Sequence, residues 1–505
     1  MASYWHPRSL AWAFVPLWLA NWTWQSDAAA IVQRRDLKAL LTDPAQTWSS
    51  NTTISFPESP SFVAATERWT VFNPPTYSAA ISPTTEDDVV NAVKLASSNS
   101  IPFLATGGRH SYSKLLGDVY DGLAIDLSQL DSIDIDEEAE TVTVGPGVIM
   151  DDILDPLYEA GFIMQTGTAW CPSVIGVALG GGVGRFEGIY GLVIDALVSV
   201  RIVTAQGDVV EASEQCNPDL FWAIRGAGAN FGVITSATFK IHRMLNQGNI
   251  FTVDFTFPGN LSSQFFQVAS EMGRNLSDKL AGNAFINFDS TTNQTQTVAN
   301  WMYYGTEDEG RKAMKPLFDI GGETTSYYVT WNKLMNTTSG GLVSQICIPG
   351  SIYDIYSANI KTFDAPTYDG CFDKLDAFYQ KYPGGRGSAV QFDFYPNQAM
   401  KAVASDKTAW PWRDAMGFLN AGMTWAPGDN VTAQAAMALG AELRSDVAST
   451  AGYDGLSVFI NYSRGDENLE QVYAAEKLSR LAQLKAQWDP DHLFSFNTGL
   501  PTKYP

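Results

Sequence analysis

Short apolar and polar runs alternate along residues 71–245 and predict both strands and helices. The apolar run at residues 101–105 has the length of a buried strand, and it leads directly into a polar turn that contains Gly107 and Gly108. Upstream of it, Thr85 precedes three acidic residues and then apolar residues at helical spacing, which is typical of a capped helix start. This alternation predicts a mixed α+β domain in which strand ends lead into glycine-rich loops.

The pattern changes twice further along the chain. Between residues 246 and 455, longer strand-like runs and more aromatic side chains predict a second domain. Residues 456–462 are then predicted to form a strand, and apolar residues at positions 478, 481 and 484 share one face of a predicted helix. Residues 31–70 give few signals and are interpreted as an N-terminal arm. A chain of 505 residues exceeds the usual size of a single core, which also favours two domains.

The first 30 residues differ from the rest of the chain. Arg8 precedes an apolar run at residues 10–20, and small residues follow at positions 28–30, which is the three-part layout of a secretory signal. The apolar run is too short to span a bilayer comfortably. Sequons for N-glycosylation recur at Asn51, Asn260, Asn275, Asn293, Asn336 and Asn430. Together these features predict a secreted, N-glycosylated protein with residues 1–30 as its signal peptide.

Charge and cysteine content narrow the classes of partner. The chain has 54 acidic and 32 basic residues, a formal net charge of −22. An acidic surface repels phosphate backbones and anionic lipids, so we expect neither nucleic acid nor a membrane as a partner. The four histidines and four cysteines lack the spacing of metal ligands, so no metal site is expected. In an oxidising compartment Cys347 and Cys371 are candidates for a disulfide, whereas the states of Cys171 and Cys216 stay open.

Three clusters of glycine stand out, at residues 107–108, 180–184 and 226–232. Exposed backbone N–H groups in such turns form concave sites that suit a pyrophosphate. The dinucleotide-binding pattern GxGxxG would need glycine where Glu187 and Phe231 stand, so a Rossmann fold does not fit. Ordinary tight turns would explain any one cluster, but three clusters in one domain favour a bound cofactor.

The order of these motifs identifies a family resemblance. The sequences TGGRHS at residues 106–111, LGGGVG at 179–184 and LFWAIRGAGANFGVIT at 220–235 resemble the FAD-linked oxidases of the berberine bridge enzyme-like group, within the vanillyl-alcohol oxidase (PCMH-type) superfamily. The tail, with Asn461-Tyr462 and later Asp489-Pro490, is similar to that group as well. The resemblance covers residues 70–245 and 456–500, and the middle of the chain matches only loosely.

This resemblance implies an α+β fold with a PCMH-type FAD-binding domain of two α/β subdomains, at residues 71–245 and completed by residues 456–505. It also implies a substrate domain at residues 246–455, an antiparallel sheet backed by helices. His110 is similar in position to the histidine that bonds the flavin 8α-methyl carbon in the family. The other residues expected to contact FAD are Gly107, Gly108, Arg109, Ser111, Gly176, Gly180, Gly181, Gly182, Gly184, Gly232, Val233 and Asn461.

One departure from the family concerns a second flavin bond. Many relatives attach FAD again through a cysteine, at the position that Ala169 occupies here. Cys171 lies two residues further on, so a second bond is not expected without a local shift of the backbone. A single covalent bond still raises the flavin potential and prevents loss of the cofactor outside a cell.

The resemblance also implies the reaction type. Hydride transfer from a substrate C–H to the flavin would be assisted by a base, and O₂ would take the electrons to give H₂O₂. Tyr462 is the first candidate for that base. Gln391 and Asp393 alternate with phenylalanines on a predicted strand and face either the flavin or solvent.

Three functions remain open at this point. The first is oxidation of a small organic substrate, such as an alcohol or a natural-product intermediate. The second is a carbohydrate oxidase, with a groove lined by Trp410, Trp412 and Trp425, although tryptophans are more often core residues than sugar platforms. The third is an FAD-binding protein without catalytic activity. The fold alone does not choose among them.

Overall fold

The computed structural model describes residues 37–339 and 346–504 of the chain. The predicted signal peptide at residues 1–30 lies outside the described residues. Residues 37–46 belong to a separate unit, and the second unit runs from Thr47 to the C-terminus. Within the described ranges, no helix combines the length and apolarity needed to cross a membrane.

The first part of the second unit contains a four-stranded sheet in the order β1-β2-β4-β3. The last three strands run parallel, and β1 is antiparallel to β2. The predicted cap is confirmed, because the Thr85 side chain accepts a hydrogen bond from the backbone of Asp88 at the start of α3. The elements are β1 (Thr53–Ser55), α2 (Pro60–Thr66), β2 (Tyr77–Ser82), α3 (Glu86–Ser98), β3 (Phe103–Thr106) and β4 (Gly122–Asp126).

A five-stranded antiparallel sheet follows, in the order β5-β6-β10-β8-β9. Phe162–Ile163 (β7) pair with His242–Arg243 (β11) in a separate two-stranded sheet. The other elements are β5 (Ile133–Asp136), β6 (Thr141–Val144), α4 (Met150–Glu159), α5 (Val174–Gly180), α6 (Glu187–Tyr190), β8 (Leu197–Val203), β9 (Val209–Ser213), α7 (Pro218–Ala227) and β10 (Val233–Lys240).

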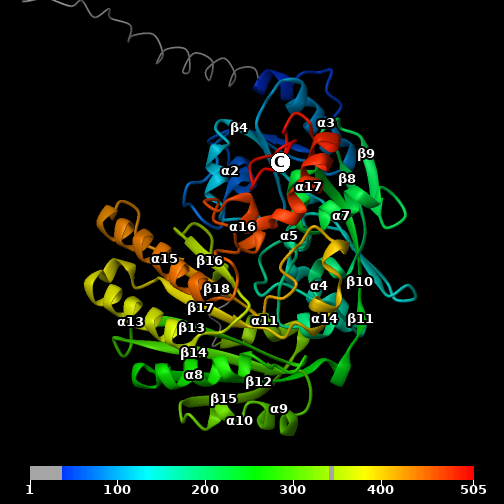
Figure 1. Ribbon diagram of the computed structural model, residues 1–505. Helices are drawn as coiled ribbons and strands as arrows, with labels where there is room; N and C mark the ends of the chain where they lie inside the picture. Colours follow the sequence, from blue (N-terminus) through cyan, green and yellow to red (C-terminus); the bar gives the residue numbers. More distant parts are fainter. Residues whose placement is uncertain (1–36, 340–345, 505) are drawn as a thin grey trace, which may run out of the picture. The chain divides into compact units, whose positions relative to one another are not determined.

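Residues 249–423 form a seven-stranded antiparallel sheet in the order β15-β12-β14-β13-β17-β18-β16. Helices α8, α13 and α15 pack along it (Figure 1), which confirms the predicted antiparallel sheet backed by helices. Its strands are β12 (Asn249–Pro258), β13 (Leu280–Asp289), β14 (Gln294–Tyr303), β15 (Glu323–Thr330), β16 (Asp354–Ile360), β17 (Ala389–Phe394) and β18 (Gly417–Met423). Its helices are α8 (Ser262–Gly273), α9 (Glu307–Ala313), α10 (Lys315–Phe318), α11 (Leu334–Thr337), α13 (Ala365–Lys381), α14 (Gln398–Ala402) and α15 (Asn430–Thr450).

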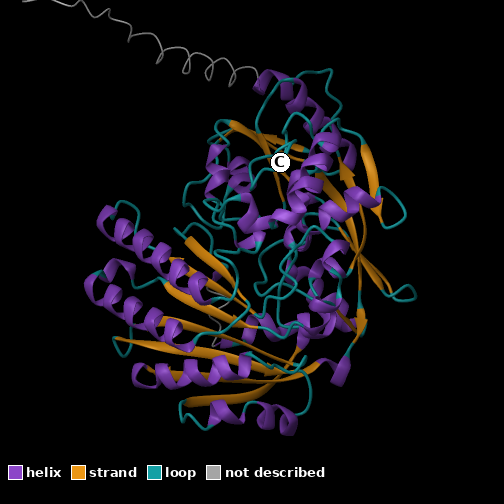
Figure 2. Ribbon diagram, viewed as in Figure 1, coloured by secondary structure: helices purple, strands orange, loops and turns teal. Residues whose placement is uncertain are grey.

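The two faces of this seven-stranded sheet differ in chemistry. On the helix-covered face, the side chains alternate inward to form one apolar core with Phe255, Phe392 and Leu419 at its centre. The opposite face carries buried polar side chains instead, and Figure 2 shows that this side lies toward the part of the chain that holds the four- and five-stranded sheets. Buried polar residues on this face include Asn283, Asn300, Ser357, Asn359 and Asp393. Buried polar groups are costly unless they serve a bonding role, so this face is a place to look for function.

The C-terminal segment returns to the first part of the unit. Helices α16 (Leu469–Tyr473) and α17 (Ala475–Trp488) are present, and the predicted apolar face of α17 is buried. The predicted strand at 456–462 is wrong: these residues are extended without a partner strand and end in a short 3₁₀ helix, η11 (Ile460–Tyr462). The backbone N–H of Val458 donates to the carbonyl of Gln471 in α16, and the carbonyl of Ser457 accepts from the backbone N–H of Asn359 in β16, so isolated hydrogen bonds hold this segment in place of a strand ladder.

A buried ion pair fixes this returning segment. Lys485 donates to Asp489 at 2.6 Å, and both side chains are fully buried. The Lys485 ammonium also donates to the carbonyls of Asn230 and Phe494, each at 2.8 Å. Because three acceptors surround one cation, the ammonium is satisfied without water, and α17 is fixed to the loop that follows α7.

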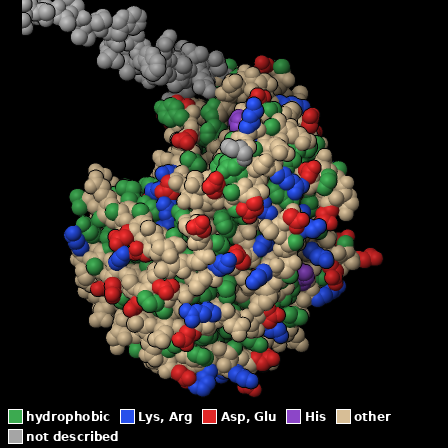
Figure 3. All heavy atoms as spheres, in the orientation of Figure 1, with side chains coloured by type: hydrophobic (Ala, Val, Ile, Leu, Met, Phe, Trp, Pro, Cys, Tyr) green, Lys and Arg blue, Asp and Glu red, His purple; other side chains and the backbone are tan. Residues whose placement is uncertain are grey.

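Surface charge is mixed on the side of the molecule drawn in Figure 3. Acidic and basic side chains are interspersed there, with apolar side chains between them. Several of the exposed charges are paired, such as Arg311 with Glu307 and Lys315 with Asp319. The strong acidic excess of the sequence is therefore partly offset locally by neighbouring cations.

Candidate functional site

A cavity of about 350 Å³ opens where the glycine-rich loops converge. Its walls include the loop after β3, helix α5, the start of β10, the η11 turn and residues 493–497. Cavities of this size lined by a few polar groups are typical of cofactor and small-molecule sites. The sequence-distant pieces meet because the C-terminal segment packs back against α5, where the Asn461 side chain donates to the carbonyl of Val177 at 2.8 Å.

The loop after β3 forms the first wall. A Cβ atom at Gly107 would overlap the carbonyl oxygen of Pro146, and one at Gly108 would lie 2.8 Å from the backbone nitrogen of Ser173. Arg109 has a positive φ of 52°, and its guanidinium is bonded to Asp126 at 2.5 Å. The two glycines are therefore required by close packing, and the Arg109 side chain supports the loop from behind.

The second glycine loop divides into two groups. Gly176, Gly180 and Gly182 line the cavity, as do Gly232 and Val233 at the start of β10. Gly181 and Gly184 do not line it. A Cβ atom at Gly181 would meet the indole of Trp410, and one at Gly184 would overlap the carbonyl oxygen of Thr166. These two glycines allow the loop to pass close to its neighbours.

His110 stands in the wall of the cavity with a neutral imidazole. Burial, together with the charge of Arg68, lowers its pKa to about 3. Its Nε2 atom is buried and has no hydrogen-bond partner in the described chain. Its ring stacks on Trp69, with centroids 4.2 Å apart and planes 14° from parallel. A neutral imidazole has a free lone pair, which is the form that bonds to carbon.

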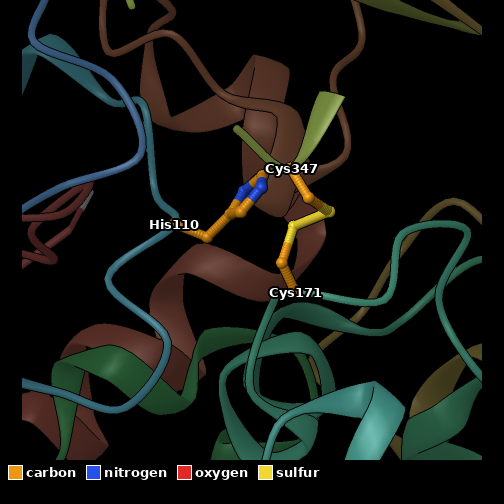
Figure 4. Close-up of side chains that lie close together, drawn as sticks. All are labelled: His110, Cys171 and Cys347. Carbon is orange, nitrogen blue, oxygen red and sulfur yellow. A yellow bond between two sulfur atoms is a disulfide. The ribbon is translucent and has the colours of Figure 1, made fainter. Parts of the chain in front are cut away.

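A disulfide lies beside this histidine. Cys171 is bonded to Cys347, and one imidazole nitrogen of His110 lies within 4.8 Å of both sulfur atoms (Figure 4). The sulfurs are bonded to each other, so the cluster offers no thiolates to a metal. The predicted Cys347–Cys371 disulfide is therefore wrong: Cys371 is a buried free thiol in α13, while Cys216 is an exposed free thiol.

Cys347 and Cys371 cannot pair because they lie in different parts of the fold. Cys347 lies in the segment 346–353, which pairs with the chain before β2 through the Thr70–Ser351 bridge, whereas Cys371 packs in the apolar core on the far side of the seven-stranded sheet. The disulfide also engages the sulfur of Cys171, so a flavin bond through that residue is excluded while the disulfide stands.

The residues present fit FAD. Glycines at three points of the wall let backbone approach a ligand closely, and residues 107–111 line the cavity as a turn of the kind that suits a pyrophosphate. Buried polar atoms without a partner in the described chain also belong to wall residues, namely the Tyr112 hydroxyl and the Asn497 Oδ1. A polar ligand would satisfy these atoms, which are otherwise costly to bury.

The predicted catalytic residues come together at the polar face of the seven-stranded sheet. Tyr462 lines the cavity, whereas Asp393 is fully buried behind it on β17. Gln391 donates to Asp393 Oδ1 at 2.7 Å, and the hydroxyl of Tyr395 donates to the same oxygen at 2.9 Å. The other carboxylate oxygen, Oδ2, has no partner among the described residues. Asp393 therefore does not face solvent, whereas Gln391 is half-buried.

The two candidate bases differ in acidity. Burial raises the pKa of Asp393 to about 6, against the opposing hydrogen bonds from Gln391 and Tyr395. Burial also raises the pKa of the Tyr462 phenol, and the charge of Asp393 adds to the rise. At neutral pH the carboxyl is therefore mainly ionised and the phenol is protonated. Of the two groups, only the carboxyl is then in a form that can accept a proton.

Several site residues gave no signal in the sequence. Ser357 and Asn420 face each other across β16 and β18, with a 2.7 Å hydrogen bond, and hydrogen bonding with Thr168 and Asn420 opposes the rise in the pKa of Tyr462. They were missed because single polar residues in the middle of strands have no recognisable spacing. Trp69 was missed because the segment 31–70 lacks any clear pattern.

The tryptophans proposed for a sugar-binding groove are packed elsewhere. Trp410 and Trp425 are 1% and 9% exposed, respectively. Trp412 is half-buried, and its indole N–H donates to the carbonyls of Val458 and Val472. None of the three presents an open aromatic face, so they give no support to a carbohydrate-binding groove.

Comparison with known proteins agrees with this site. The family described as "FAD binding domain" matches residues 77–213, and the family "Berberine and berberine like" matches residues 458–501. The FAD-linked oxidoreductase fogF of Aspergillus ruber is 43% identical over 487 residues, which is 96% of this chain and 97% of that protein. The FAD-linked oxidoreductase srdI of Neurospora crassa is 43% identical over 94% of each chain.

Solved structures share the fold. BBE-like 1 from Physcomitrella patens superposes with a TM-score of 0.79 at 22% identity, covering 90% of this chain and 98% of that one. The xylooligosaccharide oxidase from Myceliophthora thermophila, solved with xylobiose, superposes with a TM-score of 0.77 at 21% identity, covering 94% of this chain and all of that one. At these identities the similarity establishes the architecture.

Proposed function

The chain belongs to the berberine bridge enzyme-like family of FAD-linked oxidoreductases, and we propose that it oxidises a small organic substrate on a flavin bonded covalently to His110. The substrate class is an alcohol or a natural-product intermediate with an O–H group on the carbon to be oxidised. The observation that carries this proposal is the junction of two sites: a glycine-walled cavity with a neutral histidine in its wall, and a tyrosine with a buried carboxylate at the polar face of the substrate sheet.

The cofactor site follows from the chain's own groups. The loop 107–111 would hold the pyrophosphate, and Gly176, Gly180 and Gly182 would allow the flavin to lie against α5. Attachment at His110 suits its buried, neutral imidazole. A structural neighbour, glucooligosaccharide oxidase from Acremonium strictum, is described with a "6-s-cysteinyl, 8 alpha-N1-histidyl FAD". In this chain Cys171 is committed to a disulfide, so a single histidyl bond is proposed.

The reaction divides between cofactor and protein. The chemistry that FAD supplies when bound is acceptance of a hydride from the substrate carbon and delivery of the electrons to O₂, which becomes H₂O₂. Tyr462 orients the substrate O–H from the cavity wall, and Asp393 accepts the proton that leaves this group. Gln391 and Tyr395 hold one carboxylate oxygen in place and leave the other free.

The cofactor assignment is tested by the visible absorbance of the purified protein before and after acid precipitation. We expect the yellow colour to remain in the pellet of the wild type and to move to the supernatant in His110→Ala. Colour in the wild-type supernatant would disprove covalent attachment but leave FAD binding intact. A folded protein that takes up no FAD from the medium would contradict the enzyme proposal altogether.

The catalytic assignment needs a separate experiment. Small primary and secondary alcohols, phenolic benzyl alcohols and xylobiose are screened for H₂O₂ release and for anaerobic bleaching of the flavin. Asp393→Asn and Tyr462→Phe are expected to retain the flavin spectrum and lose about a hundredfold or more in kcat/KM. Asp319→Asn and Tyr120→Phe, both on exposed side chains, serve as matched controls. Bleaching without H₂O₂ would identify a dehydrogenase, and activity confined to xylobiose would identify a carbohydrate oxidase.

Secretion and glycosylation belong to the same proposal. All six predicted sequon asparagines outside the C-terminal segment are exposed, and the disulfide suits an oxidising compartment. Asn461 begins a further sequon, but its side chain donates to the Val177 carbonyl in the cavity wall, so it is expected to stay unmodified. Peptide mass measurement of protein recovered from the culture medium, before and after enzymatic deglycosylation, tests both statements. Protein found only inside the cells, without glycans, would disprove them.

A further inference from the structure

The loop that carries His110 is hydrogen-bonded to three consecutive residues, 67–69. Arg109 Nε donates to the carbonyl of Glu67 at 3.0 Å, and the backbone N–H of Trp69 donates to the carbonyl of Arg109 at 3.4 Å. Arg68, which is buried, donates to the carbonyl of Ser111 at 2.6 Å. Residues 67–69 therefore support the backbone on both sides of the histidine, although they belong to a segment with no recognisable motif.

The Trp69 side chain sits between two other rings. It stacks on His110 at 4.2 Å between centroids, and on Tyr353 at 4.5 Å with planes 8° from parallel. Two rings this close and this parallel to one indole cannot share a face of it, so the indole lies between them. Stacked aromatic pairs are stabilised beyond the area that they bury. The three rings form a continuous stack that ends at the histidine.

The outer end of the stack is anchored as well. The indole N–H of Trp69 donates to the carbonyl of Ile346, and the backbone N–H of Gly350 donates to the carbonyl of Trp69 at 3.0 Å. Tyr353 is held through its backbone N–H, which donates to Thr70 Oγ1 at 3.0 Å. Since the indole is only 5% exposed and bonded on its edge, it cannot rotate without breaking these contacts.

By contrast, His110 has no polar contact that would fix its ring. No hydrogen bond from its side chain is present within the described chain, and its Nε2 atom is buried without a partner. The last torsion of a histidine side chain is broad and roughly two-fold, so an imidazole without contacts samples many orientations. The indole against its face and the disulfide near one of its nitrogens are what restrict it here.

We propose that Trp69 is a positioning residue that orients the His110 imidazole for its bond to the flavin. This inference rests on the proposed covalent attachment at His110. The new bond joins an imidazole nitrogen to the flavin methyl carbon and replaces one N–H and one C–H. The two protons and two electrons that are released pass to O₂, which becomes H₂O₂. Bond formation of this kind needs the lone pair aimed at the carbon, and a misplacement of about 1 Å costs on the order of a hundredfold in rate.

The test measures attachment rather than turnover. Trp69→Leu, Trp69→Phe and wild type are produced under riboflavin depletion, given FAD, and precipitated with acid at intervals. The covalent fraction is the flavin in the pellet divided by total bound flavin. We expect the leucine variant to bind FAD but to attach it at least tenfold more slowly, and the phenylalanine variant to recover most of the wild-type rate because a ring is restored.

Two further variants separate positioning from loss of packing. Trp301→Leu removes an equally buried indole from the helix-covered core, and it is expected to lower thermal stability without slowing attachment. Tyr353→Leu keeps Trp69 but removes its outer ring, and an intermediate attachment rate is expected. This variant decides the question if Trp69→Leu does not fold.

The outcomes are distinct. Folded Trp69→Leu that attaches flavin at the wild-type rate would overturn the inference, as would equal slowing in Trp301→Leu. Wild-type protein that releases all its flavin in acid would instead overturn the proposed attachment at His110 itself. His110→Ala, which is expected to bind FAD with no covalent fraction, sets the baseline for every measurement.

Discussion

A Cβ atom placed on Gly180 would overlap the Oδ1 atom of Asn461. The last residue of α5 and the η11 turn therefore approach as closely as backbone and side chain allow, and the Asn461 amide is then directed to the carbonyl of Val177 at 2.8 Å. Both residues line the cavity. This contact is where the C-terminal segment closes the proposed flavin site.

Substitution of Gly180 by alanine is expected to open that contact. The methyl group would push Asn461 away, break its hydrogen bond and separate η11 from α5, so we expect loss of about 2–3 kcal/mol in stability and of most bound flavin. The flavin content per mole of protein and the thermal midpoint measure both effects. Gly370→Ala is the matched control, because a Cβ atom there meets nothing within 4 Å in helix α13, and it is expected to stabilise the protein by about 0.5–1 kcal/mol. Equal flavin content in the two variants would contradict the prediction.

Activity is expected to depend on the ionisation of Asp393, whose pKa burial raises to about 6. Since the carboxylate form accepts the proton, kcat/KM should rise as the pH increases through about 6 and then level off. Tyr395→Phe removes a hydrogen bond that lowers this pKa, so the rise should move to higher pH. Other titratable groups interact electrostatically with Asp393. They are the Arg185 guanidinium, the phenols of Tyr462 and Tyr395, and the Glu187 carboxyl. A pH profile that stays in place in Tyr395→Phe would show that another group controls it.

The same shift predicts how stability depends on pH. A carboxyl whose pKa is raised on folding binds its proton more tightly in the folded state, so its contribution is full below its unfolded pKa of about 4 and is lost as the pH rises through about 6. Asp393→Asn removes this loss. Thermal midpoints of both proteins between pH 4 and pH 7 should therefore change in favour of the variant as the pH rises, and parallel curves would argue against the shifted pKa.

The Cys171–Cys347 disulfide should contribute strongly to stability. It closes a loop with a sequence separation of 176 residues, and constraint of the unfolded chain by a loop of this length corresponds to about 5 kcal/mol in the chain-entropy model. We expect Cys347→Ser to lower the thermal midpoint, whereas Cys216→Ser, at an exposed free thiol, should leave it unchanged. Thiol labelling of the denatured wild type should find two reactive cysteines before reduction and four after it. Four before reduction would refute the disulfide.

The buried pair of Lys485 and Asp489 should behave differently from a surface pair of the same spacing. Asp489→Asn leaves a buried cation without its counter-charge, which typically costs about 3–5 kcal/mol. Asp319→Asn breaks the exposed pair with Lys315, for which less than about 1 kcal/mol is expected. Urea unfolding of the two variants under the same conditions measures the difference, and similar losses would mean that burial is unimportant here.

Local sequence patterns predicted the architecture well where they are periodic or rich in glycine. The Thr85 cap, the strands on either side of the glycine loops and the apolar face of α17 depend on residues near one another in sequence, so their signal is local. The antiparallel sheet backed by helices came from the family resemblance and is confirmed. The predicted strand at 456–462 is wrong because its hydrogen bonds go singly to α16, α5 and β16 and form no ladder, which no local pattern shows.

The candidate site was predicted only where its residues stand in local sequence motifs. His110 and the glycines that line the cavity stand in recognisable motifs, whereas Trp69 and Tyr353 are single aromatic residues that meet only in the folded chain. The prediction of the disulfide was wrong for a related reason. Cys347 and Cys371 are near in sequence, but a seven-stranded sheet separates their environments, and proximity along the chain does not measure distance across a sheet.

The cavity wall contains residues 103–112 from the first part of the chain and residues 493–497 from its last part. During synthesis the first of these stretches leaves the ribosome long before the last. A nascent chain therefore cannot enclose the cofactor, and a message that stops before α17 yields a product with one wall missing. Binding of the flavin is therefore a late step of maturation, because it requires that residues 493–497 have been synthesised and folded.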